Sequence, residues 1–165
     1  AALRTMPERV RAAAFVATHP HADPPEKRLQ RIQSADKIVL EGGTSEVILS
    51  MMGVLFAPAL DRQSAIAQRV KDSMQRTKSG GFIGALRGMA ERPDSVATLQ
   101  SAGIPTVVIA GAQDQVVEPD TARAFAQTVG APLHMIDNAG HMVMVEQPDA
   151  TTQALQMFLQ RVATG

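Results

Sequence analysis

The chain has 165 residues, of which 45% are hydrophobic and 19% are charged, a length and composition that suit a folded domain with a real core. Its 16 basic residues balance its 16 acidic ones, so charge gives no reason to expect nucleic acid or an anionic membrane as a partner. The chain has no cysteine, which excludes disulfides and zinc–thiolate sites and fits a cytoplasmic protein, and no apolar run reaches the roughly 20 residues of a membrane-spanning helix.

The first 25 residues predict one piece of an α/β core. Residues 1–9 are typical of the end of a helix, closed by Thr5-Met6-Pro7. Residues 10–17 follow as a nearly continuous apolar run, which suits a strand buried on both faces of a parallel sheet. Three prolines between positions 20 and 25 then end the regular structure.

Residues 26–92 differ in character, because helical periodicity dominates and no strand pattern occurs. Thr44 or Ser45 could cap one helix and Asp61 another, and Gly80-Gly81 looks like a break between two helices. We therefore expect a helical insertion, or cap, of four helices. Their expected bounds are 26–41, 44–56, 61–77 and 82–91.

From residue 93 to residue 165 the pattern returns to α/β. Residues 105–111 form a continuous β-branched run, and residues 133–137 read as a second strand. Each is followed by a segment with apolar residues at helical spacing, at 120–129 and 148–163. Strands that alternate with helices through short loops are parallel and joined by right-handed crossovers. The sequence thus predicts an α/β fold with three parallel strands.

Two polar clusters follow the last two predicted strands. Asp114 comes just after strand 105–111, and His141 just after strand 133–137. The carboxyl ends of parallel strands meet at one edge of the sheet, and neighbouring strands lie about 5 Å apart, so these side chains can meet. A histidine is the usual general base for a serine hydroxyl, and a carboxylate fixes its tautomer. The sequence therefore predicts an acid–histidine pair.

Residues 105–159 resemble the last two strand–helix units of the α/β-hydrolase family. The front of the chain is similar to the segment that follows the family's nucleophile, and residues 26–92 occupy the place of its cap. The shared pattern is G-x-x-D, two apolar residues and a proline, then A-G-H and E-x-P. Its members here are Gly111, Asp114, Val116, Val117 and Pro119, then Ala139, Gly140, His141, Glu146 and Pro148.

The resemblance implies a function for the pair. Asp114 and His141 would be the acid and the histidine of a catalytic triad, in the family order Ser–Asp–His. The substrate would be a small, fairly apolar ester or lactone, and no cofactor would be needed. The loop from Thr18 to Asp23 and the Pro-Pro-Glu entry to the cap are loosely similar to carboxylesterases and to enol-lactonases of the 3-oxoadipate type.

The family nucleophile stands in G-x-S-x-G between a strand and a helix, and no serine of this chain occupies that motif. Ser45 comes nearest, but it lacks the second glycine and a preceding strand. We therefore expect the carboxyl-terminal part of a hydrolase, inactive by itself, with its nucleophile upstream of Ala1. Two alternatives remain: a non-catalytic binding or scaffold module, and a relative with an aspartate nucleophile, as in dehalogenases and epoxide hydrolases.

His19, His21 and Asp23 could suggest a metal site because they alternate within one loop. Three such residues in a proline-rich loop without a helical scaffold are weak evidence for zinc, and we predict no metal. The resemblance implies instead that this loop borders the substrate pocket, which makes His19 a candidate substrate-binding residue.

Three methionines are further candidates for the substrate pocket. Met51, Met52 and Met142 could supply soft, adaptable apolar contacts, although each is more often plain core. His134 alternates with apolar neighbours and is expected to face solvent, while Glu146 is expected to anchor the start of the last helix.

The strand at 10–17 is expected to leave one edge unpaired, with bare backbone groups on an apolar strand. We therefore expect the chain to bind the missing amino-terminal part of the same fold or to associate with itself.

Overall fold

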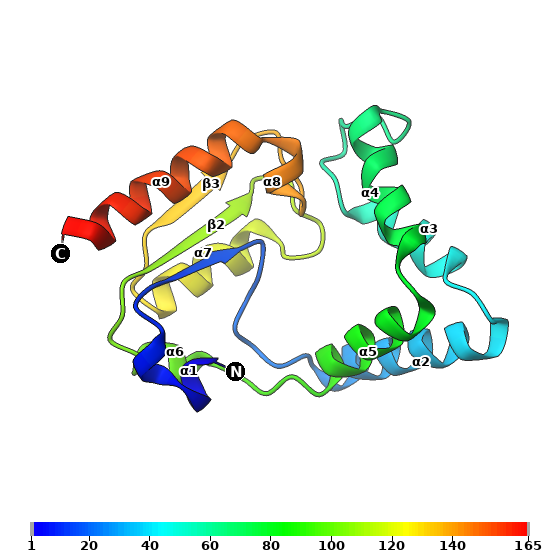
Figure 1. Ribbon diagram of the computed structural model, residues 1–165, viewed down its shortest axis with the longest axis horizontal. Coiled ribbons are helices and arrows are strands. Elements are labelled where there is room, and N and C mark those ends of the chain that lie inside the picture. The colour runs from blue at the N-terminus through cyan, green and yellow to red at the C-terminus, as the bar shows by residue number, and fades with distance from the viewer. Residues whose placement is uncertain (1, 165) are drawn as a thin grey trace. The chain divides into compact units, whose positions relative to one another are not determined.

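The computed structural model describes residues 2–164, which form two compact units (Figure 1). The sheet unit comprises Ala1–Pro20, Val54–Leu60 and Ser95–Gly165, and the helical unit comprises His21–Gly53 and Asp61–Asp94. The outermost residues, 1 and 165, which end the predicted core segments 1–25 and 93–165, lie outside the described residues.

The sheet has three parallel strands, which confirms the predicted α/β class. They are β1 (Ala13–Val16), β2 (Thr106–Gly111) and β3 (Leu133–Ile136), in the order β1-β2-β3. The strand predicted at 10–17 is shorter than expected, for two reasons. A 3₁₀ turn occupies Pro7–Arg9 before it, and Ala17 takes a positive φ of 47°, which ends the extended backbone.

Helices cover both faces of the sheet (Figure 1). On one face Val107 and Ile109 of β2 pack against Phe158 of α9 (Pro148–Thr164). On the other face Val108 packs against Phe125 of α7 (Pro119–Thr128), and the short helices α1 (Ala2–Thr5) and α6 (Val96–Gln100) complete this layer. Alternate residues of β2 thus face opposite layers, as a central parallel strand requires.

The sequence does not predict helix α8 (Val143–Glu146) of the sheet unit. This helix has four residues, too few for a helical pattern to repeat along the sequence.

The helical unit contains α2 (Pro25–Glu41), α4 (Ala65–Arg76), α5 (Ser79–Ala90) and α3 (Ser45–Val54), the last of which ends in the sheet unit. These are the four predicted helices, with two corrections. Gly80-Gly81 lies inside α5 and does not separate two helices.

The second correction concerns the start of α4. Ser64, not Asp61, is its N-cap, with the Ser64 hydroxyl accepting from Ala67 N at 3.3 Å. The Asp61 carboxylate instead accepts from Gln63 N at 2.8 Å, which builds a turn before the helix. Over residues 2–164, no helix is both long and apolar enough to cross a membrane.

Within the described residues, β1 pairs with a strand on one side only. Its inward hydrogen bonds run from Ala13 N to Pro105 O at 3.0 Å and from Ala17 N to Ile109 O at 2.8 Å. Because bonding directions alternate along a parallel strand, Ala14 presents its N–H at the opposite, unpaired edge. The side chain of Ala14 is also exposed.

An Ala14→Pro substitution should reduce self-association of the isolated chain, because it removes a donor at the free edge and leaves the β1–β2 ladder intact. The measurement is light scattering after size-exclusion chromatography over a range of concentrations. Ala13→Pro is the matched control, since it removes an inward hydrogen bond and should lower the free energy of unfolding by about 1–3 kcal/mol. A parent chain that stays monomeric at every concentration would contradict the expectation.

Candidate active site

Asp114 is held by the loop that follows β2, and it is only 3% exposed. One carboxylate oxygen, Oδ1, accepts from Val116 N at 2.7 Å and from Val117 N at 2.9 Å. A short acidic side chain that binds backbone N–H groups two and three residues ahead folds its own loop into a tight turn. The second oxygen, Oδ2, is therefore fixed in direction.

That second oxygen meets the imidazole of His141. The distance between His141 Nδ1 and Asp114 Oδ2 is 2.9 Å, so the structure brings together the two side chains that the sequence pairs. A buried carboxylate acts as acceptor, which makes Nδ1–H the donor and leaves Nε2 as the basic nitrogen. The His141 side chain is 24% exposed, so a reactant can approach it.

The two loops approach closely because three backbone segments stack without side chains between them. A Cβ added to Gly111 would lie 2.1 Å from Gly140 O, and one added to Gly140 would lie 2.4 Å from Ala57 N. Real Cβ atoms do not approach other atoms so closely. Glycine at 111 and 140 is therefore a condition for the Asp114–His141 distance.

The third segment of this stack is residues 54–60, which we call the strap. Leu55 O accepts from His141 N at 2.9 Å and from Met142 N at 3.2 Å, and the strap residue Phe56 is fully buried. Sequence reasoning missed this role and placed residues 44–56 in one helix. The apolar run at 55–57 before a proline was the available signal, but it does not name the distant loop that it contacts.

Glu146 joins the strap to the histidine loop. Its buried carboxylate accepts from Ala57 N at 2.7 Å through Oε2 and from Gly140 N at 2.9 Å through Oε1. The expectation that Glu146 anchors the start of the last helix is therefore wrong, because both carboxylate oxygens bind other segments. The hydroxyl of Thr151 instead ties the first turn of α9 to α8, donating to Val143 O at 3.0 Å and Gln147 O at 2.8 Å.

The remaining candidate residues fall in both units. In the sheet unit His19 follows β1, at the same sheet edge as the acid–histidine pair, and both His19 and Met142 are half-buried. In the helical unit, α3 carries Met51, which is exposed, and Met52, which is buried. His134 on β3 is half-buried, where the sequence favoured an exposed side chain.

The loop that suggested a metal site is organised by ion pairs. Within residues 2–164, no three histidine or carboxylate side chains lie close enough to hold a metal ion. Asp23 is buried and pairs with Arg31 and, at 4.0 Å, with Arg92. His21 Nδ1 lies 3.3 Å from Asp94 Oδ2.

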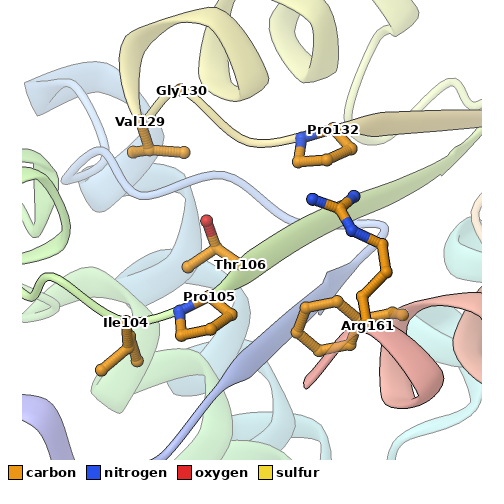
Figure 2. Close-up of a pocket in the computed structure, with 8 residues that line it drawn as sticks. Ile104, Pro105, Thr106, Val129, Gly130, Pro132 and Arg161 are labelled. Atoms are coloured by element: carbon orange, nitrogen blue, oxygen red, sulfur yellow. The ribbon is translucent and has the colours of Figure 1, made fainter. Parts of the chain in front are cut away.

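A separate pocket of about 290 Å³ lies at the amino-terminal ends of β2 and β3, the sheet edge opposite to the pair (Figure 2). Among the described residues, the one charged side chain that lines this pocket is that of Arg161 of α9. Because no carboxylate or imidazole of this described part of the chain lines the pocket, it holds no acid–base pair. The full lining is Ile104, Pro105, Thr106, Val129, Gly130, Pro132, Phe158 and Arg161.

Comparison with known proteins points to hydrolases. A family model described as serine hydrolase matches residues 89–159. The 3-oxoadipate enol-lactonase 1 of Acinetobacter baylyi is 26% identical over 121 residues, which are 73% of this chain and 45% of the lactonase. The chain spans about half the length of the curated relatives that it matches.

Solved structures agree with this likeness. A thermophilic esterase from Thermogutta terrifontis is 28% identical with a TM-score of 0.90, over 96% of this chain and 59% of the esterase. The enol-lactonase from Burkholderia xenovorans shares the fold, with 20% identity and a TM-score of 0.82 over 96% of this chain and 60% of the lactonase.

A Gly140→Ala substitution should lower the free energy of unfolding by about 2–3 kcal/mol, because its methyl group would push the strap away from the histidine loop. Urea denaturation followed by circular dichroism measures this loss. Gly84→Ala in α5 is the control, since a Cβ there meets nothing within 4 Å and should raise helix stability by about 1 kcal/mol. Equal stability of the Gly140→Ala variant and the parent would contradict the proposed stack.

Proposed function

We propose that this chain, whose fold matches that of α/β-hydrolases, supplies the acid and the histidine of a serine-type hydrolase that cleaves small apolar esters or lactones. The observation that carries the proposal is the 2.9 Å contact between His141 Nδ1 and the buried Asp114 carboxylate. The match to the serine hydrolase family and the named activities of the relatives support it.

In the proposed reaction His141 moves one proton in each direction. Its Nε2 takes the proton of a serine hydroxyl as the serine oxygen attacks the carbonyl carbon of the substrate. It then gives that proton to the leaving alcohol oxygen as the ester bond breaks. Water is deprotonated by the same nitrogen, attacks the acyl group and releases the serine, which regains its proton. Asp114 stabilises the imidazolium at both stages.

The nucleophile of this mechanism must come from elsewhere, because the chain contains no G-x-S-x-G. We place it in a strand–turn–helix segment that pairs with the free edge of β1. Two observations support this placement: β1 has one unpaired side within residues 2–164, and the chain spans about half of its curated relatives. A parallel strand added there would open its carboxyl end onto the edge that holds Asp114 and His141.

The proposed substrate class follows from the relatives and from the residues near the pair. Half-buried Met142, next to His141, offers an adaptable apolar surface for a small acyl or lactone ring. In this proposal His19 borders the same pocket.

Removing the imidazole should abolish turnover once this chain is joined to its nucleophile segment. His141→Ala should lower kcat by roughly four orders of magnitude or more, and Asp114→Asn by about 10⁴, since the acid fixes the productive tautomer. Hydrolysis of p-nitrophenyl acetate measures both effects. The control is His134→Ala, which removes a half-buried histidine of β3 and should leave kcat unchanged. An unchanged kcat in the His141→Ala enzyme would remove this residue from the mechanism.

The nucleophile itself can be identified by sequence and by labelling. We expect the coding sequence upstream of Ala1 to encode G-x-S-x-G, and we expect a fluorophosphonate probe to label that serine only when His141 is intact. An aspartate at that position would favour the dehalogenase or epoxide hydrolase alternative. A protein with neither nucleophile would be a non-catalytic binding module.

A further inference from the structure

Glu146 is a buried carboxylate that the proposed reaction does not use. It contacts neither Asp114 nor the His141 ring in the hydrogen bonds that the structure records. Both of its oxygens face backbone N–H groups, one from the strap and one from the residue that precedes His141. A carboxylate is costly to bury, so this pair of hydrogen bonds requires an explanation.

We propose that Glu146 is a positioning residue that sets the direction of His141 by locking the strap against the histidine loop. The proposal rests on the proposed function for its catalytic consequence. Its structural basis is a closed ring of contacts. The Glu146 carboxylate accepts from Gly140 N in the histidine loop and from Ala57 N in the strap. Two residues earlier in the strap, Leu55 O accepts from His141 N, which returns the ring to the histidine loop.

The ring acts on the backbone on both sides of the histidine. The N–H groups of Gly140, His141 and Met142 are consecutive, and each donates to one of the two holders, Glu146 or Leu55 O. Three fixed N–H groups leave the Cα–Cβ bond of His141 little freedom to turn. The imidazole therefore meets Asp114 without relying on that single hydrogen bond for its orientation.

Loss of the carboxylate would remove the acceptor that two buried N–H groups now share, those of Ala57 and Gly140. Gly140 is buried and so is Ala57, and water cannot enter a stack in which a Cβ does not fit. The strap would then separate from Gly140 to rehydrate these N–H groups, and Leu55 O would move with it. His141 would lose its backbone support, although neither its own side chain nor Asp114 had been substituted.

The test compares Glu146→Gln and Glu146→Ala with Thr151→Val. Thr151 is the matched control because it is a buried residue in the same region whose hydroxyl donates to Val143 O and Gln147 O, which lie outside the ring. Two properties are measured: the downfield proton resonance of His141 Nδ1–H in the chain itself, and kcat and KM in the enzyme reconstituted with its nucleophile segment.

With Glu146→Gln, we expect the Nδ1–H resonance to exchange with solvent at least about tenfold faster, since one charge-assisted hydrogen bond is lost. In the reconstituted enzyme kcat should fall about tenfold or more while KM changes little. Glu146→Ala should show a larger effect in the same direction. Thr151→Val should lower the melting temperature but preserve both the resonance and kcat.

The proposal is overturned if Glu146→Gln lowers only the melting temperature, as Thr151→Val does, and keeps the resonance and kcat. A lost resonance together with no hydrolysis in any reconstituted enzyme would support the positioning role and count against the proposed function. Should the Glu146 variants fail to fold, hydrogen exchange of the parent chain decides: the amides of Ala57 and Gly140 must exchange in its slowest class, and solvent-like exchange at either one refutes the ring.

Discussion

The close stacking of three backbone segments at the carboxyl edge of the sheet is the constraint on which the site depends. Gly111 ends β2, Gly140 precedes His141, and the strap passes beside Gly140 with no side chain between them. Because the segments touch through bare backbone, the loops after two neighbouring strands come within one hydrogen bond of each other. The closeness of Asp114 and His141 depends on the absence of a Cβ at Gly111 and Gly140 as much as on the acid and the histidine that the two loops carry.

Two buried carboxylates at this sheet edge, those of Asp114 and Glu146, bind different kinds of partner. One carboxylate oxygen of Asp114 accepts from the backbone of its own loop, and the other binds the imidazole of His141. Its charge therefore faces a group that can carry a proton. Glu146 offers both oxygens to backbone N–H groups, so its charge organises the chain and has no proton to exchange with those partners. Both side chains are carboxylates, and only their partners distinguish the acid that we propose for the triad from the carboxylate that we propose holds the backbone.

The sequence predicts the parts of this structure that rest on local patterns. Continuous β-branched runs mark β2 and β3, and the rule that active sites lie beyond the carboxyl ends of parallel strands is enough to pair Asp114 with His141. Helix α8 is too short to show a period, and the start of α4 depends on which of two capping residues binds the helix and which binds its own turn. The role of the strap is harder to predict, because its partners lie roughly sixty to ninety residues away and no local pattern encodes them.

The free edge of β1 follows from the same logic of parallel strands. A parallel sheet is ordinarily buried on both faces and continued at its sides, yet β1 is flanked by β2 alone in the described chain and is only partly buried. Any parallel strand that pairs with β1 must open its own carboxyl end at the rim where Asp114, His141 and His19 already gather. In the proposed function, the unpaired edge of β1 and the source of the nucleophile are therefore one structural question, and a single docked strand, followed by a turn that bears a nucleophile, would answer both.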